Sequence, residues 1–417
     1  MQAHLENPVI APTTKSKATV RRIDTHSIPS SVLWAVAILS FSTSLFVIAR
    51  HQTAALDLVP VWTAVHAFLH HQSPYAVPLF VYPPSLLLLA APLGLVGFST
   101  ARLAFLLLDT AAILFAGALC LRLFNLRWRS TAGAVLLFAL AIFLPVRDTL
   151  SMDNVNGFIL VGEIGMILAA ARRRWLLAGA LLGCTLAIKP VLLPLLLVLL
   201  LYRRWRSIGL AIAIPALLSL LALPLTVEGG QFFTHVIPFL LNGNSHQDQV
   251  YNVSLAGVAG VLGLPAALTT ALRLVVLIAA AVLMWQRWRA AGDDVLRLVE
   301  LSGIILLATF LVFSFSWSYY PIYLLPLLVW MVNPASRMNG WITWVALYCI
   351  GGPDVWYWQR FGSHGLILGM LRIALGCLLL LIAFGLGLRQ RRVRLAEAAA
   401  CRASMAALAS DVFAPTQ

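Results

Sequence analysis

The feature of this sequence that most constrains its fold is a ladder of long apolar runs separated by short clusters of arginine. Hydrophobic residues make up 61% of the 417 residues and charged residues only 11%, whereas a soluble domain carries about 25% charged residues. No soluble core could bury so much apolar side chain, so lipid is the solvent for most of the chain. We predict an all-α polytopic membrane protein with about twelve transmembrane helices. The predicted helices lie near 33–49, 101–121, 131–147, 155–171, 175–188, 190–202, 208–226, 267–286, 297–313, 321–333, 341–353 and 365–388.

The basic clusters predict how the chain is oriented in the membrane. The formal net charge is +14, and the basic residues stand in short segments between apolar runs, as in the cytoplasmic loops of membrane proteins. This pattern favours a membrane protein over a nucleic-acid binder. With the clusters in the cytoplasm, both termini are cytoplasmic and the loops 50–100, 148–154, 227–266, 314–320 and 354–364 lie outside. The clusters are Lys15 to Arg22, Arg122 to Arg129, Arg172 to Arg174, Arg203 to Arg206, Arg287 to Arg289, and Arg389 to Arg394.

We expect one membrane domain at 31–390, between a polar cytoplasmic tail at 1–30 and a cytoplasmic C-terminal tail at 391–417. The apolar run at 83–97 does not fit as a further span, because proline stands near both of its ends and both flanking segments are predicted to lie outside. It is therefore predicted to be a re-entrant or surface-lying element. Irregular backbone is tolerated at membrane depth only where it lines a cavity or is buried in protein.

Seven of the nine histidines and six of the fifteen acidic residues lie on the predicted outer face, whereas the cytoplasmic clusters consist mostly of arginine. Carboxylates and imidazoles are the side chains that most often transfer protons in catalysis. The distribution therefore predicts chemistry on the outer face of the membrane. The outer residues are Asp57, Asp148, Asp153, Glu228, Asp248 and Asp354, with His51, His66, His70, His71, His235, His246 and His364.

Two charged residues at the predicted membrane surface are candidates for that chemistry. Asp57 follows the first apolar run between two leucines, and a partly desolvated carboxylate is a stronger base. The alternative is an ordinary solvated loop aspartate. Lys189 precedes Pro190 and interrupts an apolar stretch, where a lysine is costly unless paired. It suits a phosphate group, and the alternative is a lysine that extends to the interface.

Amide and aromatic side chains at the predicted outer turns suit carbohydrate, because they hydrogen-bond hydroxyls or stack on sugar rings. Helix capping is the alternative explanation for the asparagines and aspartate, and an interface belt for the aromatic residues. The histidines and aspartates of the loop 227–255 show no metal-ligand spacing, so no metal is predicted. The side chains concerned are Asp153, Asn154 and Asn156 at the 155–171 helix, Asn252 in the longest outer loop, and Tyr319 and Tyr320 in a later turn.

Short motifs follow one another in an order that resembles a known enzyme family. They are Asp57, Ser73-Pro74-Tyr75, Val81-Tyr82-Pro83-Pro84, Ala91-Pro92-Leu93-Gly94, Asn154-Val155-Asn156-Gly157, Ile188-Lys189-Pro190, Arg203-Arg204-Trp205-Arg206 and Asn252-Val253-Ser254-Leu255. Over about residues 33–385 the chain resembles the polyprenol-phosphate-dependent glycosyltransferases of the GT-C type, glycosyltransferase family 87 or DUF2029. Within that family it is most similar to the mycobacterial members that branch cell-wall arabinan with α-(1→3)-linked arabinofuranose.

The resemblance implies a GT-C fold whose active site faces the outside of the plasma membrane, with no cofactor. It implies decaprenylphosphoryl arabinofuranose as the donor and an arabinan or lipoglycan chain as the acceptor. The implied general base is Asp57, which deprotonates the acceptor hydroxyl for an inverting transfer. The implied partner of the donor phosphate is Lys189, with His235 as the second candidate. The implied sugar and acceptor contacts are Tyr82, Asp153, Asn154, Asn156, Asn252, Tyr319 and Tyr320.

Two alternative functions stay open at this point. The first is an α-mannosyltransferase that uses polyprenyl phosphomannose to extend a lipoglycan or phosphatidylinositol mannoside. Such members usually read Gly-Gln-x-Asn where this chain has Asp153-Asn154-Val155-Asn156, and they often carry a histidine pair where it has Tyr319-Tyr320. Those differences disfavour mannose. The second alternative is a transporter of a polyprenyl-linked lipid, for which paired repeats are expected and none is found.

Overall fold

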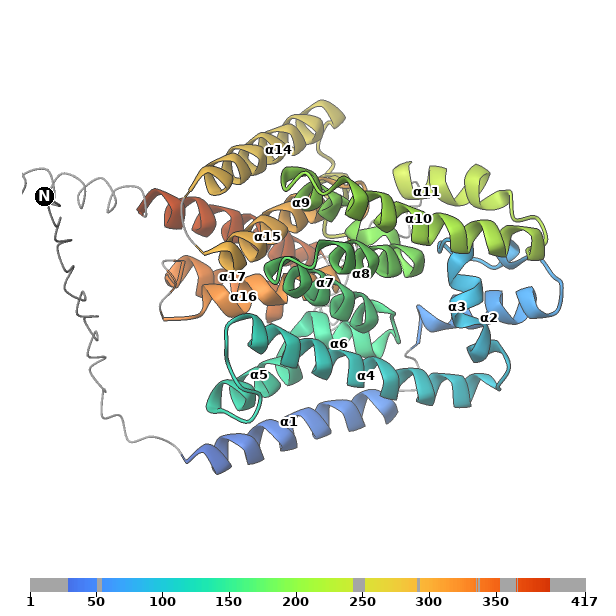
Figure 1. The fold of residues 1–417 in the computed structure, drawn as a ribbon, viewed down its shortest axis with the longest axis horizontal. Helices are drawn as coiled ribbons and strands as arrows, with labels where there is room; N and C mark the ends of the chain where they lie inside the picture. The colour runs from blue at the N-terminus through green and yellow to red at the C-terminus, as the bar shows by residue number, and fades with distance from the viewer. Residues whose placement is uncertain are drawn as a thin grey trace, which may run out of the picture.

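The computed structural model describes residues 29–50, 55–242, 252–290, 293–334, 336, 338–352, 365 and 367–390. Across these residues the chain is helical (Figure 1), and its one extended pairing is an isolated antiparallel bridge between Asn252 and Trp317. The longer helices are α1 (Ser30–Arg50), α4 (Phe98–Leu123), α5 (Thr131–Ile142), α7 (Asn156–Ala171), α8 (Trp175–Ile188), α10 (Trp205–Ala222), α14 (Ala266–Arg289), α15 (Asp294–Val312) and Ile367–Gln390. The shorter helices are α2 (Leu58–Leu69), α3 (Pro84–Gly94), α6 (Leu144–Ser151), α9 (Leu196–Leu201), α11 (Ile237–Asn242), α13 (Leu255–Val261), α16 (Leu325–Met331) and α17 (Trp341–Gly351).

Short 3₁₀-helical and π-helical segments connect several of these elements. The 3₁₀ segments are η1 (Pro74–Ala76), η2 (Pro190–Leu195), η3 (Leu223–Leu225) and η5 (Tyr320–Leu324), and η4 (Phe232–Val236) is π-helical. Proline stands at the start of η1 and η2, where its missing N–H costs no hydrogen bond.

The structure confirms a mostly helical, multi-pass membrane protein. Every predicted helical range overlaps a helix, since in lipid the backbone must satisfy its own hydrogen bonds. Six of the described helices are long and apolar enough to cross a membrane. A seventh span results if α5 and α6, which meet at an angle of 59°, count as one bent helix. The remaining apolar helices are shorter, so the number of twelve spans stays a prediction. The tails, predicted at 1–30 and 391–417, lie almost entirely outside the described residues.

The helices differ in how deeply they are buried. Nearly all of α15 is buried, and it lies beside α7 in the interior. In contrast, α1, α10 and α14 keep most of their large apolar side chains at the surface. Figure 1 shows α1 along one edge of the bundle and α14 along the opposite edge. In a membrane protein such apolar surfaces face lipid.

The helices collect the predicted outer turns at one end of the bundle and the arginine-rich turns at the other. The segments at 55–57, 152–154, 252–254 and 314–320 are joined by hydrogen bonds, and Lys189 lies over the rings of Tyr319 and Tyr320; we call this the polar end. The segments at 172–175, 202–206, 287–290 and 293–297 contact each other; we call this the arginine end. A helix such as α8 runs from the arginine end, at Arg174, to the polar end, at Lys189.

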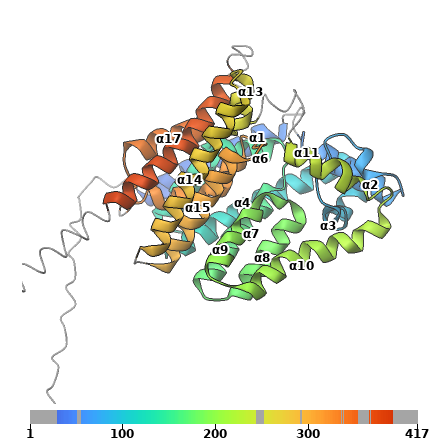
Figure 2. The ribbon, with the colours of Figure 1, turned by 90° about the horizontal axis from the view of Figure 1, so that it is seen from above.

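The run at 83–97 forms the short helix α3 at the polar end. It packs against α2 and α10 (Figures 1 and 2). The Ser85 hydroxyl donates a 2.6 Å hydrogen bond to the carbonyl of Ala187, at the end of α8. This bond fixes the start of α3 beside the end of α8, and so it places Tyr82 near Lys189.

Candidate active site

Asp57 stands directly before α2, where the chain enters the polar end. Its backbone N–H donates to the carbonyl of Met152 at 3.1 Å, and Ala55, whose φ is 78°, donates to Ser151 at 3.0 Å. These bonds attach the segment before α2 to the end of α6. The Asp57 carboxylate does not cap α2, although aspartate is a favoured capping residue. The half-buried carboxylate is therefore available to other side chains.

Asn154 connects that carboxylate to the aromatic turn after α15. Its side-chain amide donates to Asp57 Oδ2 at 2.5 Å and to the Tyr319 hydroxyl at 3.2 Å. Both Asn154 and Tyr319 are buried. The structure thus brings together three residues that are up to 262 positions apart in sequence (319 minus 57).

Lys189 lies beside the same tyrosine, Tyr319. It follows α8 in an extended conformation, with φ −155° and ψ 127°, because the next residue is proline and disfavours helix before it. Its ammonium nitrogen lies 5.7, 5.4 and 5.1 Å from the ring centroids of Tyr82, Tyr319 and Tyr320. Aromatic faces attract a cation at such distances. Removal from water lowers the pKa of Lys189 to about 8, and the nearby Asp57 acts in the opposite direction.

The tyrosines of this cluster are neutral donors and acceptors. Burial raises the pKa of Tyr82, Tyr319 and Tyr320, and the negative charge of Asp57 raises it further. Their hydroxyls therefore keep their protons at physiological pH. A carboxylate, a cation and three phenols converge here, which suits proton transfer next to an anionic group. We call these residues, with Asn154, the Asp57–Lys189 cluster.

Asp153 forms an ion pair that the sequence did not reveal. Its carboxylate lies 3.0 Å from Nε of Arg102, in the first turns of α4, and its φ is 50°. Burial raises the pKa of Asp153 to about 6, and Arg102 acts to lower it. One signal pointed to Arg102: like Arg50 and Arg147, it stands at the predicted outer end of a span, away from the arginine clusters.

Asn156 is bound within the protein. Its amide donates to Thr149 Oγ1 at 3.2 Å, and its carbonyl accepts from the Tyr323 hydroxyl at 2.6 Å. One residue further, the Gly157 N–H donates to Asp109 Oδ1 at 2.9 Å. These contacts fix the first turn of α7. Sequence reasoning assigned no role to Asp109 or Tyr323, because a polar residue inside an apolar run shows no partner until the helices are packed.

Asn252 is also engaged by its neighbours, and His235 lies apart from the cluster. The Asn252 amide donates to the Ser314 carbonyl at 2.6 Å, and its oxygen accepts from the N–H of Ser316 at 2.9 Å. Asn252 thereby holds the aromatic turn that carries Tyr319. His235 is exposed in η4, and no contact between described residues brings it to Lys189.

The fold and this cluster define a class: a helical, multi-pass membrane protein with a carboxylate, a lysine and three tyrosines gathered at one end of its bundle. The chain matches the profile described as "Glycosyltransferase family 87" over residues 80–314. It is 34% identical over 373 residues to the "Alpha-(1->3)-arabinofuranosyltransferase" of Mycobacterium tuberculosis, covering 86% of this chain and 84% of the relative. It is 31% identical over 369 residues to the protein of that name from Mycolicibacterium smegmatis, covering 86% and 85%.

A more distant relative has a different named activity. It is the "Polyprenol-phosphate-mannose-dependent alpha-(1-2)-phosphatidylinositol pentamannoside mannosyltransferase" of Mycobacterium tuberculosis, 27% identical over 293 residues, 66% of this chain and 64% of the relative. The chain belongs to glycosyltransferase family 87, as the order of its motifs predicted. It is accordingly a glycosyltransferase, with a sugar donor and a glycan acceptor as its substrates.

Proposed function

We propose that the protein transfers arabinofuranose from decaprenylphosphoryl arabinofuranose to an arabinan acceptor, forming an α-(1→3) branch with inversion. Its similarity to relatives with that named activity, over most of both chains, supports the proposal. The observation that carries it is that Asp57 and Lys189 meet at one residue. Asn154 links Asp57 to the Tyr319 hydroxyl, and the Lys189 ammonium lies 5.4 Å from the Tyr319 ring centroid.

In the proposed reaction, Asp57 accepts the proton of the acceptor hydroxyl as its oxygen attacks the anomeric carbon. The attack comes from the face opposite the polyprenyl phosphate, so a β-linked donor gives an α linkage. The new bond joins the acceptor oxygen to the anomeric carbon, and the bond between that carbon and the phosphate oxygen breaks. The departing polyprenyl phosphate gains negative charge, which Lys189 stabilises.

The contacts around the cluster support these roles. Lys189 forms no ion pair with any described carboxylate, so its charge is available to a phosphate. The side-chain oxygen of Asn154 is buried and has no hydrogen-bond partner among the described residues. In the proposal it accepts a hydrogen bond from a sugar hydroxyl near Asp57. We assign Tyr82 and Tyr320 to the sugar and keep His235 as the second candidate for the phosphate.

The remaining predicted sugar contacts have supporting roles in this proposal. Asn156 fixes the first turn of α7, and Asn252 holds the turn that carries Tyr319 and Tyr320. Asp153, paired with Arg102, holds the segment that presents Asn154.

We infer that the polar end faces the outside of the plasma membrane and that the chain crosses it twelve times, with both termini in the cytoplasm. The positive charge of the opposite end supports this orientation. To test this orientation, a single cysteine replaces Leu79, Glu228 or Arg206 in a variant that lacks the native cysteines. An impermeant thiol reagent added to intact cells is expected to label the first two only. Labelling of Arg206→Cys alone would reverse the orientation.

Mannosyl transfer is the second candidate, because of the similarity to the mannosyltransferase. Isolated membranes that contain the protein are supplied with radiolabelled polyprenylphosphoryl arabinose or polyprenylphosphoryl mannose, with a short arabinan as acceptor. We expect label from the arabinosyl donor only. Incorporation from the mannosyl donor alone would replace the proposal with the second candidate.

A further inference from the structure

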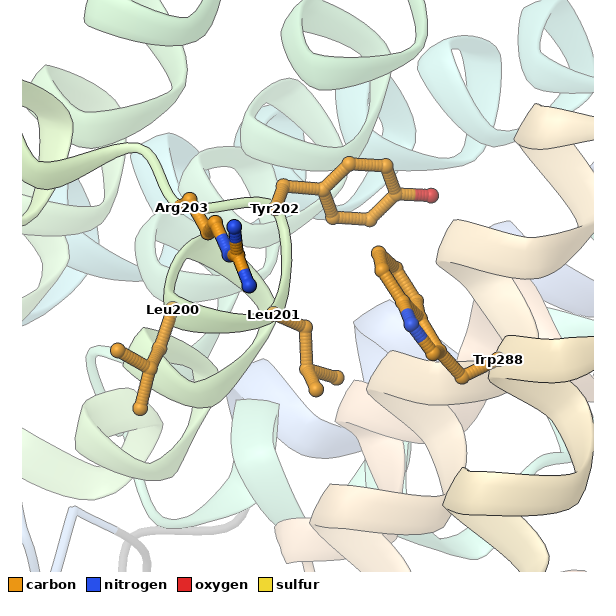
Figure 3. Close-up of a pocket in the computed structure, with 5 residues that line it drawn as sticks. All are labelled: Leu200, Leu201, Tyr202, Arg203 and Trp288. Atoms are coloured by element: carbon orange, nitrogen blue, oxygen red, sulfur yellow. The ribbon is translucent and has the colours of Figure 1, made fainter.

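A surface hollow lies at the arginine end, between the turn after α9 and the last turn of α14. Figure 3 shows the Arg203 guanidinium and the Trp288 ring on opposite sides of Leu201, with the Tyr202 ring above them. The Asp57–Lys189 cluster is at the other end of the molecule, and none of its residues lines the hollow. The lining residues are Leu200, Leu201, Tyr202, Arg203 and Trp288.

Several buried donors around this hollow have no hydrogen-bond partner within the described residues. The Tyr202 ring contacts two tryptophan rings here: its centroid lies 4.8 Å from that of Trp175 and 4.9 Å from that of Trp288. Arg297 lies beside the Tyr202 hydroxyl, without the geometry of a hydrogen bond. Buried donors in proteins nearly always have a partner, so this group indicates a ligand with several acceptor oxygens. The unpartnered donors are Trp175 Nε1, Tyr202 Oη, Arg204 Nε, Arg287 Nη1 and Arg297 Nε.

Around the hollow, arginine side chains outnumber carboxylates. The fully buried Arg287 pairs with Glu300, and Asp294 is shared by Arg173 at 2.5 Å and Arg297 at 3.1 Å. Two further arginines, at 203 and 204, form no ion pair with a described carboxylate. Arg203 is exposed and Arg204 is half-buried, so their charges are available to an anion from outside the protein.

The conformation of Arg203 favours a role for its side chain. Its φ is 54°, and it follows α9 at the position where helices usually end in glycine. A side chain in this conformation costs free energy that glycine avoids. An arginine here, pointing toward the hollow, therefore contributes something that glycine could not.

We propose that this hollow binds the phosphate of an anionic phospholipid from the membrane leaflet at the arginine end. Guanidinium groups pair with phosphate through two parallel hydrogen bonds, and tryptophan and tyrosine favour the headgroup level of a bilayer. Exposed apolar side chains continue from the hollow along both helices, with Leu200 on α9 and Val282 on α14. They provide a surface for the acyl chains, which a soluble phosphate would leave unused. The site is independent of the proposed glycosyl transfer.

The test compares lipids by the thermal unfolding of the purified full chain in neutral detergent. Phosphatidylglycerol is titrated against wild type, and phosphatidylcholine and inorganic phosphate are titrated in parallel. We expect phosphatidylglycerol to raise the unfolding temperature in a saturable way and the other two to have little effect. Equal stabilisation by phosphatidylcholine would overturn the proposal. Stabilisation by inorganic phosphate alone, at the same phosphate concentration, would overturn the lipid as the source of the anion.

The variant Arg203→Gly separates binding from folding. Glycine suits the left-handed turn, so the variant folds, but it lacks a guanidinium at the hollow. The affinity for phosphatidylglycerol is expected to fall roughly tenfold or more, as for loss of a hydrogen bond to a charged group. The control Arg206→Ala removes an equal charge from an exposed position three residues away and is expected to bind as wild type does. Unchanged affinity in Arg203→Gly, or an equal loss in both variants, would contradict a specific site.

Discussion

The side-chain amide of Asn154 donates a 2.5 Å hydrogen bond to the carboxylate of Asp57. The same amide group donates to the Tyr319 hydroxyl at 3.2 Å, so Asn154 fixes Asp57 relative to the aromatic turn. A carboxylate held by a donor on one oxygen keeps its other oxygen in a defined direction. In the proposed reaction this makes Asn154 a positioning residue for the base as well as a contact for the acceptor sugar.

Replacement of Asn154 by leucine is expected to lower kcat for arabinosyl transfer, because the Asp57 carboxylate loses the hydrogen bond that holds it in position. The leucine side chain is of similar size and adds no charge. The transfer rates of the folded, purified variant and of wild type measure this. An equal kcat in Asn154→Leu would separate Asn154 from the base.

Donor use is expected to weaken as the pH rises above about 8, the pKa to which burial lowers Lys189. Below that pH the ammonium is charged and can pair with the donor phosphate, and above it the charge is lost. Arginine stays charged at any accessible pH, so Lys189→Arg is expected to remove this decline while it keeps partial activity. The measurement is kcat/KM for the donor between about pH 6 and pH 10, since kcat/KM reports the free enzyme. A decline of equal size in Lys189→Arg would place the titrating group elsewhere.

Loss of Arg102 is expected to destabilise the protein in a pH-dependent way. Asp153 already has a raised pKa of about 6, and removal of its cation raises the pKa further. The cost of Arg102→Met relative to wild type is therefore small near pH 5, where the carboxyl is protonated, and grows above about pH 6. It reaches about 3 kcal/mol if the ionised Asp153 stays buried. Thermal unfolding at the two ends of this range, with Arg102→Lys as the charge-conserving control, tests the sign.

The close approach of α4 and α7 is expected to require glycine at 157. A Cβ atom there would lie 2.3 Å from Asp109 Oδ1, so Gly157→Ala must displace the carboxylate that holds the start of α7. We expect a loss of about 1–3 kcal/mol, as for overpacking in a core. Gly97→Ala is the matched control, because a Cβ at Gly97 meets nothing within 4 Å. Equal unfolding temperatures for the two variants would contradict this packing.

The sequence predicted which elements form, but it could not predict which side chains meet. Apolar length and arginine clusters place Asp57, Lys189 and Tyr319 at outer turns, because they report burial in lipid and charge near the membrane surface. Neither signal says which turns are neighbours across the bundle. That depends on contacts such as the hydrogen bond from Ser85 to the carbonyl of Ala187, which involves a backbone group that every residue possesses.

The asparagines also show that the sequence could not predict which side chains are engaged by neighbours. Asn154, Asn156 and Asn252 are all polar residues at predicted outer turns, and the sequence assigns all three to sugar. In the structure the carbonyl oxygen of Asn154 has no partner among the described residues, whereas Asn156 and Asn252 are held by neighbouring groups. Composition does not distinguish an amide with an unused acceptor from one whose groups are all engaged by the protein.

The central claim is tested most directly by measuring arabinosyl transfer with purified wild type and Asp57→Asn. The donor is polyprenylphosphoryl arabinose and the acceptor is a short arabinan. The variant keeps the shape of the side chain and removes the base, and Glu228→Gln changes an exposed carboxylate outside the cluster as a control. We predict transfer by wild type and by Glu228→Gln, with a loss of at least ~100-fold in a folded Asp57→Asn variant, as expected for removal of a general base. Transfer at an undiminished rate by Asp57→Asn would contradict the assignment of the base.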